Sequence, residues 1–390
     1  MKKIIILFLS YILFFFNSNL LSDEKNLELK IGLLAPFSGE YRSLGNSLLL
    51  STQLALNELN DPRVKIIPRD TGSYDKDKLN NAVREIIEAG AKIIIGPPDS
   101  EYFEELYKYK DTIFISLSNK NPKINENIIS IGVSLESQLK SLEDFINKEN
   151  KKKTLIIFPK NEYAEFIEKK LKILKLKNYK IFKYSSDPKI LTGEIEKITN
   201  YSQRKRNLDL RKKFLEDKED EQSKRELKLL EQKYTLGEVN FDSIIIIDFG
   251  SSLKSVLASL VFSEVDDKTV LYTTVNQWFD KSIFYENSVS TLYYPSVNYK
   301  NFKKYNKTYF DEFNQNPNEI TILAYDALGL IYYFWKKNGK IDSINNFLIK
   351  DKIKGKIGTF SFENGSVNQK LKIYKTKNNK IIEYWFFSLI

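Results

Sequence analysis

Short apolar runs that alternate with helix-like segments constrain the fold of this chain most strongly. Residues 31–34 form an apolar run that ends at Pro36, a polar turn FSGEYRSLG follows, and apolar residues return at helical spacing from Leu48 to Leu59. The order repeats with strands expected at 64–69, 91–95 and 112–115 and helices at 75–89 and 101–109. Such runs, bounded by Gly, Pro and Ser, predict a mostly parallel sheet with helices on both faces.

The same pattern begins again after a helix expected at 135–147 and the polar linker KENKKK. Strands are expected at 154–158, 179–184, within FDSIIIIDFG and at 269–273, with helices at 163–176 and 253–262. A late helix, ITILAYDALGLIYYFWKKNG, ends on two lysines and a glycine, which suits a helix C-terminus. Three β-rich pieces, GKIGTFSFE, NQKLKIYKT and IIEYWFFSLI, then predict an antiparallel meander.

These segments predict two α/β lobes. We expect lobe 1 over residues 27–148 and lobe 2 over residues 153–295. Residues 296–390 are expected to supply hinge-region helices and a β-rich segment that return to the lobes.

Residues 202–233 interrupt the alternation of strands and helices. This segment has eleven cations, eight anions and few apolar side chains. Asp220 with Lys224, and Glu221 with Arg225, have the spacing of ion pairs along a helix. Leucines 208, 215, 227 and 230 offer a thin apolar stripe. Two interpretations stay open: a solvated helical excursion between two strands, or an arm that contacts another protein. Either predicts a mostly exposed insertion that adds little to the stability of the lobes.

Residues 1–22 have the pattern of a cleavable signal peptide. Lys2 and Lys3 precede an apolar run at 4–16, and small or polar residues lead to an expected cleavage site near Ser22. The alternative is a membrane anchor, but a span needs about 20 apolar residues. We therefore expect export to the periplasm and no membrane span after cleavage. Because the chain has no cysteine, we expect neither a lipid-anchored cysteine nor a disulfide.

The absence of histidine and cysteine removes many kinds of catalytic and metal site. Ser-His-Asp and Cys-His machinery, a histidine base and histidine or cysteine zinc ligands are all excluded. The formal charge is +10, but the lysines are spread along the chain without an arginine-rich arm. We expect no catalytic residues, no metal, no cofactor and no nucleic-acid partner.

Three turns in lobe 1 carry the best candidates for a binding site. Ligands of open α/β sheets bind beyond the carboxyl ends of the strands. The turns PFSGEY, GPPDS and SLSNK stand there, and two of them precede helices whose positive ends favour an anionic group. Their polar side chains suit a carboxylate: Ser38, Ser100, Ser116, Ser118 and Asn119. A Ser or Asp just before a helix, Asp99 included, could instead be its N-cap.

The quoted segments together resemble the leucine-binding-type, or type I, periplasmic binding proteins. The resemblance rests on KIGLLAPFSGEYRSLGNSLLLSTQLALNELN, AKIIIGPPDS and FISLSNKNP in order, and on TLIIFPKNEYAEFIEKKLK and AYDALGLIYY further along. It implies two α/β lobes joined by three crossovers that close on a ligand. It also implies a non-enzymatic protein that captures a small polar or amino-acid-like solute for an importer permease.

The resemblance also implies which residues contact the solute. The turns matching Pro98 to Ser100 and Ser116 to Asn119 would hold a carboxylate, and Tyr163 matches a tyrosine of the second lobe. Asn119 and Lys120 stand where small residues are usual, and Asp248 lies near the expected second-lobe acid. The full set of candidate ligand contacts is Ser38, Tyr41, Pro98, Asp99, Ser100, Ser116, Ser118, Asn119, Tyr163, Phe249, Gly250 and Trp278.

One part of the second lobe is similar to the penicillin-binding-protein activators, which share this fold and stimulate peptidoglycan synthases. The similarity lies in YTLGEVNFDSIIIIDFGSSLKSVLASLVFSEVDDKTVLYTTVNQWFDKS, in the charged insertion before it and in the loop of Trp278. It implies an alternative function, a regulator of peptidoglycan synthesis that acts through protein contacts with a synthase. Outer-membrane members of that branch carry a lipidated cysteine, which this chain does not have.

Overall fold

The computed structural model describes residues 28–122, 126–279, 282, 291–347, 352–363, 366–377 and 380–384. The chain divides into unit 1, Met1–Gly132 with Lys303–Val367, and unit 2, Val133–Phe302 with Asn368–Ile390. It therefore passes between the units three times. Helix α5 (Leu135–Lys148) belongs to unit 2, whereas the sequence had placed those residues in lobe 1. The expected signal peptide, residues 1–22, lies outside the described residues.

Unit 1 contains a parallel five-stranded sheet in the order β2-β1-β3-β4-β5. Its strands are β1 (Leu29–Ala35), β2 (Val64–Asp70), β3 (Ile93–Ile95), β4 (Ile113–Ser116) and β5 (Ile128–Ser130). The central strands are buried along their length because helices cover both faces, as their unbroken apolar sequences predict. The predicted fold class is therefore confirmed for this unit.

The helices of unit 1 begin and end where their sequences supply caps. The Asp75 carboxylate accepts a hydrogen bond from the Lys78 N–H at the start of α3 (Lys76–Glu88). Helix α12 (Ile322–Asn338) ends on Lys336, Lys337 and a left-handed Gly339, as predicted. Other helices of this part are α2 (Arg42–Leu59), α4 (Phe103–Leu106), η1 (Ser100–Tyr102), η3 (Glu319–Thr321) and η4 (Ile344–Phe347), with α11 (Tyr299–Phe313) beginning in unit 2. The single helix expected at 101–109 is replaced by η1 and the short α4.

Unit 2 contains a seven-stranded sheet in the order β15-β14-β10-β9-β8-β6-β7. Strands β6 (Thr154–Pro159), β7 (Tyr179–Tyr184), β8 (Ser243–Ile246), β9 (Leu271–Thr274) and β10 (Leu292–Ser296) are parallel. Strands β14 (Lys372–Lys377) and β15 (Lys380–Glu383) extend the sheet in antiparallel fashion beyond β10.

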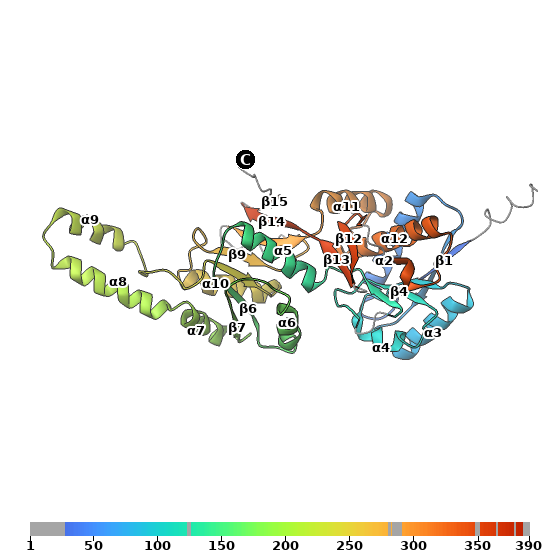
Figure 1. Cartoon of the computed structure of the whole chain (residues 1–390), viewed down its shortest axis with the longest axis horizontal. Coiled ribbons are helices and arrows are strands. Elements are labelled where there is room, and N and C mark those ends of the chain that lie inside the picture. The colour runs from blue at the N-terminus through green and yellow to red at the C-terminus, as the bar shows by residue number, and fades with distance from the viewer. Residues whose placement is uncertain are drawn as a thin grey trace, which may run out of the picture. The chain divides into compact units, whose positions relative to one another are not determined.

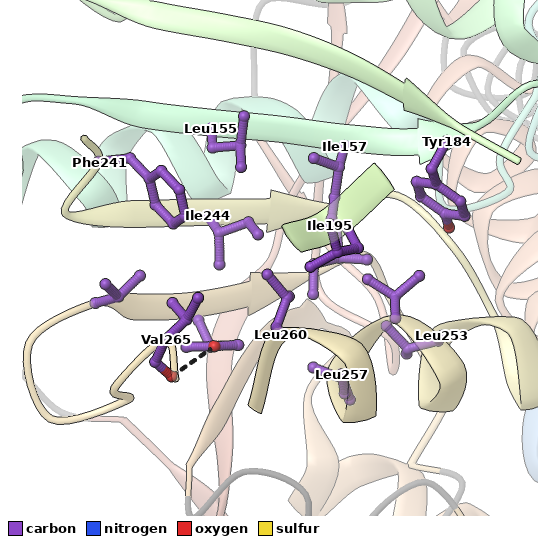
Figure 2. Close-up of a cluster of buried hydrophobic side chains, with 14 of the residues drawn as sticks. Leu155, Ile157, Tyr184, Ile195, Phe241, Ile244, Leu253, Leu257, Leu260 and Val265 are labelled. Atoms are coloured by element: carbon purple, nitrogen blue, oxygen red, sulfur yellow. Dashed lines mark hydrogen bonds between the residues drawn. The ribbon is translucent and has the colours of Figure 1, made fainter. Parts of the chain in front are cut away.

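Successive residues of the central strands face opposite helical layers. Ile157 and Ile244 pack against α7 (Pro188–Ile198) and α10 (Gly250–Phe262) in the cluster that Figure 2 shows. Ile156 and Ile245, one residue along each strand, instead pack against α5 and α6 (Ala164–Leu171). This alternation explains the run IIII in FDSIIIIDFG, because both faces of the strand are buried.

The C-terminal meander expected from the sequence is wrong. Strands β11 (Ile353–Lys354), β12 (Thr359–Glu363) and β13 (Ser366–Lys370) form a separate small sheet. The piece NQKLKIYKT holds the end of β13 and most of β14, and the chain crosses between the units at residues 367–368. Strand β14 pairs with β10, with Tyr374 opposite Tyr294, so the decisive partner is distant in sequence.

The charged insertion forms a hairpin of two helices, α8 (Tyr201–Glu216) and α9 (Glu221–Leu230), which projects from the rest of unit 2 (Figure 1). We call residues 201–233 the arm. Leu208, Leu215 and Leu230 are buried along its seam, as the stripe predicted. Arg211 and Glu226 form an ion pair between the two helices, at 2.8 Å. The predicted pair with Lys224 is wrong, because Asp220 instead caps α9 by accepting from Ser223.

The base of the arm is not an exposed excursion. Arg204 is only 4% exposed. Its guanidinium donates to the carbonyl oxygens of Thr199 and Glu264 at 3.1 and 3.0 Å and also to that of Ser263. Thr199 and Ser263 are the C-caps of α7 and α10, so Arg204 places a positive charge at the negative ends of two helices.

No helix in the described parts of the chain is both long and apolar enough to cross a bilayer.

Candidate functional site

A hollow of about 290 Å³ lies in unit 1 beyond the carboxyl ends of β1 to β4. All three predicted turns reach it, and the chain after β2 forms a further wall. Its lining comprises Pro36, Tyr41, Leu44, Thr71, Gly72, Ser73, Tyr74, Pro98, Asp99, Ser100, Tyr102, Ser118, Asn119, Lys120 and Ile320. The structure therefore brings together six of the predicted contacts: Tyr41, Pro98, Asp99, Ser100, Ser118 and Asn119.

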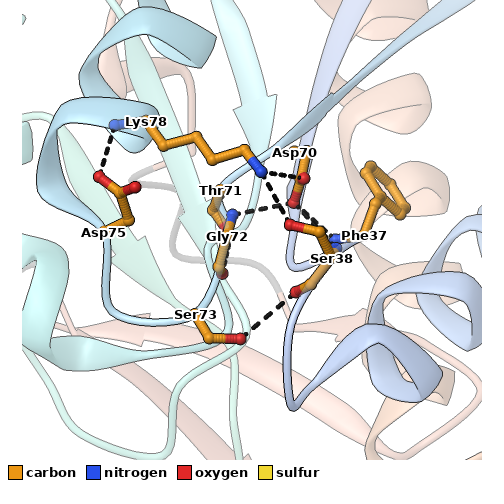
Figure 3. A network of polar contacts seen from close by, with 8 residues as sticks. All are labelled: Phe37, Ser38, Asp70, Thr71, Gly72, Ser73, Asp75 and Lys78. Atoms are coloured by element: carbon orange, nitrogen blue, oxygen red, sulfur yellow. Dashed lines mark hydrogen bonds and ion pairs between the residues drawn. The ribbon is translucent and has the colours of Figure 1, made fainter.

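Asp70, the last residue of β2, joins two walls of this hollow (Figure 3). One carboxylate oxygen accepts from the backbone N–H groups of Phe37, Ser38 and Gly72 at 2.8, 3.2 and 2.8 Å. The other lies 2.5 Å from Lys78 Nζ, which also donates to Ser38 Oγ at 2.7 Å. Burial disfavours the charged carboxylate, but the hydrogen bonds from Lys78, Ser38 and the N–H groups outweigh it and hold the pKa of Asp70 well below its usual range.

Two glycines let the turns approach the strands closely. A Cβ on Gly45 would lie 2.1 Å from the carbonyl oxygen of Pro36, so only glycine lets the first turn of α2 pack against the end of β1. Gly96 has φ +96°, and its Cβ would lie 2.2 Å from the carbonyl oxygen of Leu34. Both residues hold predicted turns in place. The first turn is also shorter than expected, because α2 already begins at Arg42.

Two tyrosines form one side of the hollow. The Tyr41 and Tyr74 rings meet edge to face with centroids 5.7 Å apart, and their hydroxyl oxygens are 3.2 Å apart. This hydrogen bond raises the pKa of the Tyr74 hydroxyl. Both side chains are exposed, by 37% and 54%, and so present aromatic surface to a ligand. Tyr74 has a left-handed backbone, φ +59°, which turns the chain sharply after β2.

The turn after β4 supplies polar groups, but not all those predicted. Ser116 is fully buried, and its hydroxyl donates to the Pro97 carbonyl oxygen at 2.9 Å. It therefore braces two turns against each other and does not line the hollow. Ser118 lines it, although its hydroxyl also accepts from the Lys120 N–H at 3.1 Å. Asn119 is exposed, and Lys120 brings a cationic side chain to the same wall.

Ser38 and Asp99 have structural partners. Ser38 does not line the hollow, since its hydroxyl accepts from Lys78. The Asp99 carboxylate accepts from the Glu101 N–H at 2.9 Å and so caps η1, the alternative considered from the sequence. Because η1 and α4 are short, the helix dipole expected after GPPDS contributes little to anion binding.

The four candidates of unit 2 lie along one edge of its sheet. Tyr163 follows β6, Phe249 and Gly250 follow β8, and Trp278 follows β9, each beyond a carboxyl end. Tyr163 and Phe249 are 49% and 57% exposed, while Trp278 is partly buried with its ring 6.4 Å from that of Phe302. Their role as ligand contacts stays a prediction.

The Asp248 carboxylate already accepts hydrogen bonds from neighbouring residues of unit 2. The donors are the Tyr184 hydroxyl, the Ser252 hydroxyl and the Phe249 N–H. Asp248 therefore fixes the start of α10 and is poorly suited to hold a ligand ammonium. Among the described residues, no three carboxylates come close enough to hold a metal ion.

Sequence reasoning missed the wall after β2, which contributes Thr71, Ser73 and Tyr74. The segment RDTGSYD carried a signal, because a glycine and small polar residues follow a strand of the same sheet. The strand VKIIPRD contains a proline and charges, so its carboxyl end was less evident than those of the apolar strands. Lys120 was noticed only as a departure from the family pattern.

Comparison with known proteins agrees with this architecture. The family model described as periplasmic binding protein matches residues 28–172. The isoleucine complex of the branched-chain amino acid transporter substrate binding protein LivJ from Streptococcus pneumoniae has TM-score 0.54 and 16% identity, over 92% of this chain and all of that one. A branched-chain amino acid transporter ligand-binding protein from Burkholderia xenovorans has TM-score 0.63 and 13% identity, over 92% and 95%. The fold is that of the type I periplasmic binding proteins.

The same fold occurs in a regulator. The C-domain of LpoA from Haemophilus influenzae, a regulator of PBP1A, has TM-score 0.61 and 13% identity, over 91% of this chain and all of that domain. The chain spans 59% of full-length LpoA from the same organism. A search of curated protein sequences found no match. At these identities the likeness establishes the fold and leaves the ligand and the partner to be inferred.

Proposed function

We propose that this chain is a non-enzymatic binding protein that captures a small polar or amino-acid-like solute for an importer permease. The observation that carries the proposal is the hollow in unit 1, where donors from four strand ends converge. The type I fold supports it, because the solved transport proteins with this fold include LivJ in complex with isoleucine.

The chemistry of the hollow suits a carboxylate joined to a compact body. Ser100, Asn119 and Lys120 offer a hydroxyl, an amide and a cation, which are good donors to an anionic oxygen. Tyr41 and Tyr74 offer ring faces and edges to the rest of the solute, and an aromatic face also attracts an ammonium group. A volume of about 290 Å³ accommodates a molecule of amino-acid size.

The test is calorimetry and thermal shift with a panel of amino acids, short peptides and peptidoglycan fragments. A ligand at 100 times its dissociation constant should stabilise the protein by about 2.7 kcal/mol. The variant Ser100→Ala/Tyr74→Ala/Asn119→Ala should lose about 1–3 kcal/mol of binding free energy for each ligand hydrogen bond removed. A control, Ser43→Ala/Asn46→Ala, changes exposed residues of α2 outside the lining and should bind normally. Equal affinity in both variants would reject the proposal.

A second candidate function is regulation of peptidoglycan synthesis through protein contacts. Two observations favour it: the fold is shared with the LpoA C-domain, and the arm projects from unit 2 with a mostly exposed surface. Its test is binding of the purified protein to a peptidoglycan synthase from the same cells, with and without the arm. A protein that serves only as a solute receptor should show no binding to the synthase, with or without the arm.

Both functions require export, and we propose a periplasmic location. Cell fractionation and mass spectrometry check it, because the signal predicted at residues 1–22 should be absent from the native protein. An intact Met1 would contradict signal cleavage.

A further inference from the structure

The tip of the arm and one of the two hollows beside its base carry opposite charges. The tip, residues 216–221, contains five carboxylates and one lysine in the turn between α8 and α9. All of these residues are exposed. Asp220 caps α9, while Glu216, Asp217, Glu219 and Glu221 form no ion pair within the described part of the chain. The tip is therefore an exposed anionic surface that a cationic partner could contact.

A lysine-lined hollow lies at the other end of the arm. It has a volume of about 420 Å³ and opens at the amino ends of β6 and β7. Its charged lining residues are Lys153, Lys180 and Lys197, all exposed, and no carboxylate stands among the described residues that line it. Asn178, Asn200 and Asn240 add amide donors. Lys197 lies in the last turn of α7 and Asn200 is the N-cap of α8, so this hollow adjoins the base of the arm.

The arm cannot satisfy these charges by itself. Helix α8 has 16 residues and is therefore about 24 Å long, which separates the tip from the base of the same arm. Between the two ends, three large apolar side chains point to solvent: Leu210, Phe214 and Leu229 are 57%, 53% and 64% exposed. The thin seam inside the hairpin buries other leucines and leaves these three outside it, where the Phe214 ring lies beneath the cations of Arg211 and Lys218.

We propose that two copies of this chain pair through their arms, antiparallel and related by a two-fold axis. In such a pair each acidic tip meets the lysine-lined hollow at the base of the other arm, and both contacts form at once because the interface is isologous. The exposed apolar side chains of the two shafts face each other and leave water. Every feature used lies within unit 2, so the pairing needs no particular arrangement of the two units.

The charge pattern favours a second copy over an anionic membrane as the occupant of the hollow. The segment 202–233 has eleven cations and eight anions, so its net charge is only +3. An anionic membrane would attract each lysine of the hollow by roughly 1 kcal/mol but would supply no cation for the tip carboxylates. A second copy instead supplies an anion for the hollow and a cation for the tip in one interface.

The experiment is sedimentation velocity of the purified protein over a concentration series in 50 and 500 mM salt. We expect a dimer at low salt whose dissociation constant rises about tenfold or more at high salt, because exposed charge pairs are screened. Glu216→Lys/Asp217→Lys/Glu219→Lys (tip variant) and Lys153→Glu/Lys180→Glu/Lys197→Glu (hollow variant) should each be monomeric. A control, Glu40→Lys/Glu88→Lys/Asp111→Lys, changes the net charge as the tip variant does but on exposed residues of unit 1, and should dimerise normally.

Mixing the tip variant with the hollow variant gives the decisive result. In the mixed pair one contact is charge-reversed but complementary and the other is unchanged, so a heterodimer should appear although neither variant dimerises alone. A protein that stays monomeric at every concentration overturns the proposal, as does a tip variant that dimerises normally. A monomer that binds phosphatidylglycerol vesicles through the three lysines would assign the hollow to lipid and would also overturn it.

Discussion

Replacing Arg204 by methionine is expected to destabilise unit 2 by about 3 kcal/mol. The guanidinium donates to three carbonyl oxygens and to Thr235 Oγ1, and the carbonyl oxygen of Arg204 itself accepts from the Leu236 N–H at 3.0 Å. These contacts tie the first turn of the arm to the ends of α7 and α10 and close the base of the hairpin. Methionine keeps the apolar stem and removes only the side-chain donors.

The magnitude is the difference between large opposing contributions. Four hydrogen bonds from a charged donor contribute about 1.5–3 kcal/mol each, or roughly 6–12 kcal/mol in total. Against this stands the cost of burying the charge, several kcal/mol, which also lowers the pKa of Arg204 without deprotonating it. Thr235 and Glu264, two of the four acceptor residues, line a cavity of about 670 Å³, where water can replace part of the lost hydrogen bonding. A net loss of about 3 kcal/mol remains.

The assay is urea unfolding followed by circular dichroism, combined with hydrogen exchange of the strands of unit 2. Arg204→Lys keeps a cation at the helix ends but has fewer donors, so it should lose about half as much stability. Lys205→Met is the matched control, because Lys205 is the exposed neighbour and its replacement should change stability by less than about 0.5 kcal/mol. If Arg204→Met unfolds at the same urea concentration as Lys205→Met, Arg204 does not join the arm to the lobe and this reasoning fails.

Three further predictions concern unit 1, and the glycine that serves as a comparison for the third lies in unit 2. Burial raises the pKa of Asp326 to about 6, although hydrogen bonds from the N–H groups of residues 356 and 357 oppose the rise. The contribution of Asp326 to folding stability is therefore full below about pH 4 and falls by up to about 3 kcal/mol as the pH rises through 6. Asp326→Asn should remove this pH dependence from the free energy of unfolding measured in urea. Lys78→Met should lower the free energy of unfolding by about 1 kcal/mol, since the ion pair with Asp70 is partly exposed. It should also speed hydrogen exchange at the Phe37 N–H. Unchanged exchange would show that Lys78 does not hold the turn. Gly96→Ala should lower the free energy of unfolding by at least about 2 kcal/mol in thermal unfolding, because alanine is strained at φ +96° and its Cβ would collide with a carbonyl oxygen. Gly193→Ala has open space around the new Cβ on helix α7 and should instead stabilise the protein by about 0.5–1 kcal/mol.

The elements that the sequence predicted well are those decided by local patterns. Strand β7 has the predicted bounds, α3 lies within one residue of its predicted ends, and α12 ends on the predicted lysines and glycine. Period, caps and apolar runs are properties of adjacent residues, so the sequence reveals them. The C-terminal strands were misassigned for the opposite reason. Their pairing depends on β10, some 80 residues earlier, and a β-rich sequence does not reveal its partner.

The candidate site shows the same division. The turns after β1, β3 and β4 could be predicted to converge, because parallel strands end at one edge of a sheet. Which serines face the hollow could not, since Ser116 and Ser118 are two residues apart and differ only in the hydrogen bonds that the folded turn provides. Arg204 was hidden among ten other cations of the insertion, and its role depends on two helix ends brought together in space.

The positions of the two kinds of candidate surface in unit 2 have a functional consequence. Tyr163, Phe249 and Trp278 lie beyond the carboxyl ends of the strands, whereas the lysine-lined hollow and the base of the arm lie at the amino ends. A strand of four to six residues, at about 3.3 Å per residue, keeps these edges roughly 13–20 Å apart. Substitutions at the two edges share no contacting residues, so their effects on solute affinity and on arm pairing should be additive. A tip variant that also lost solute affinity would show that the edges are coupled, and that the arm reports or controls the state of the binding site.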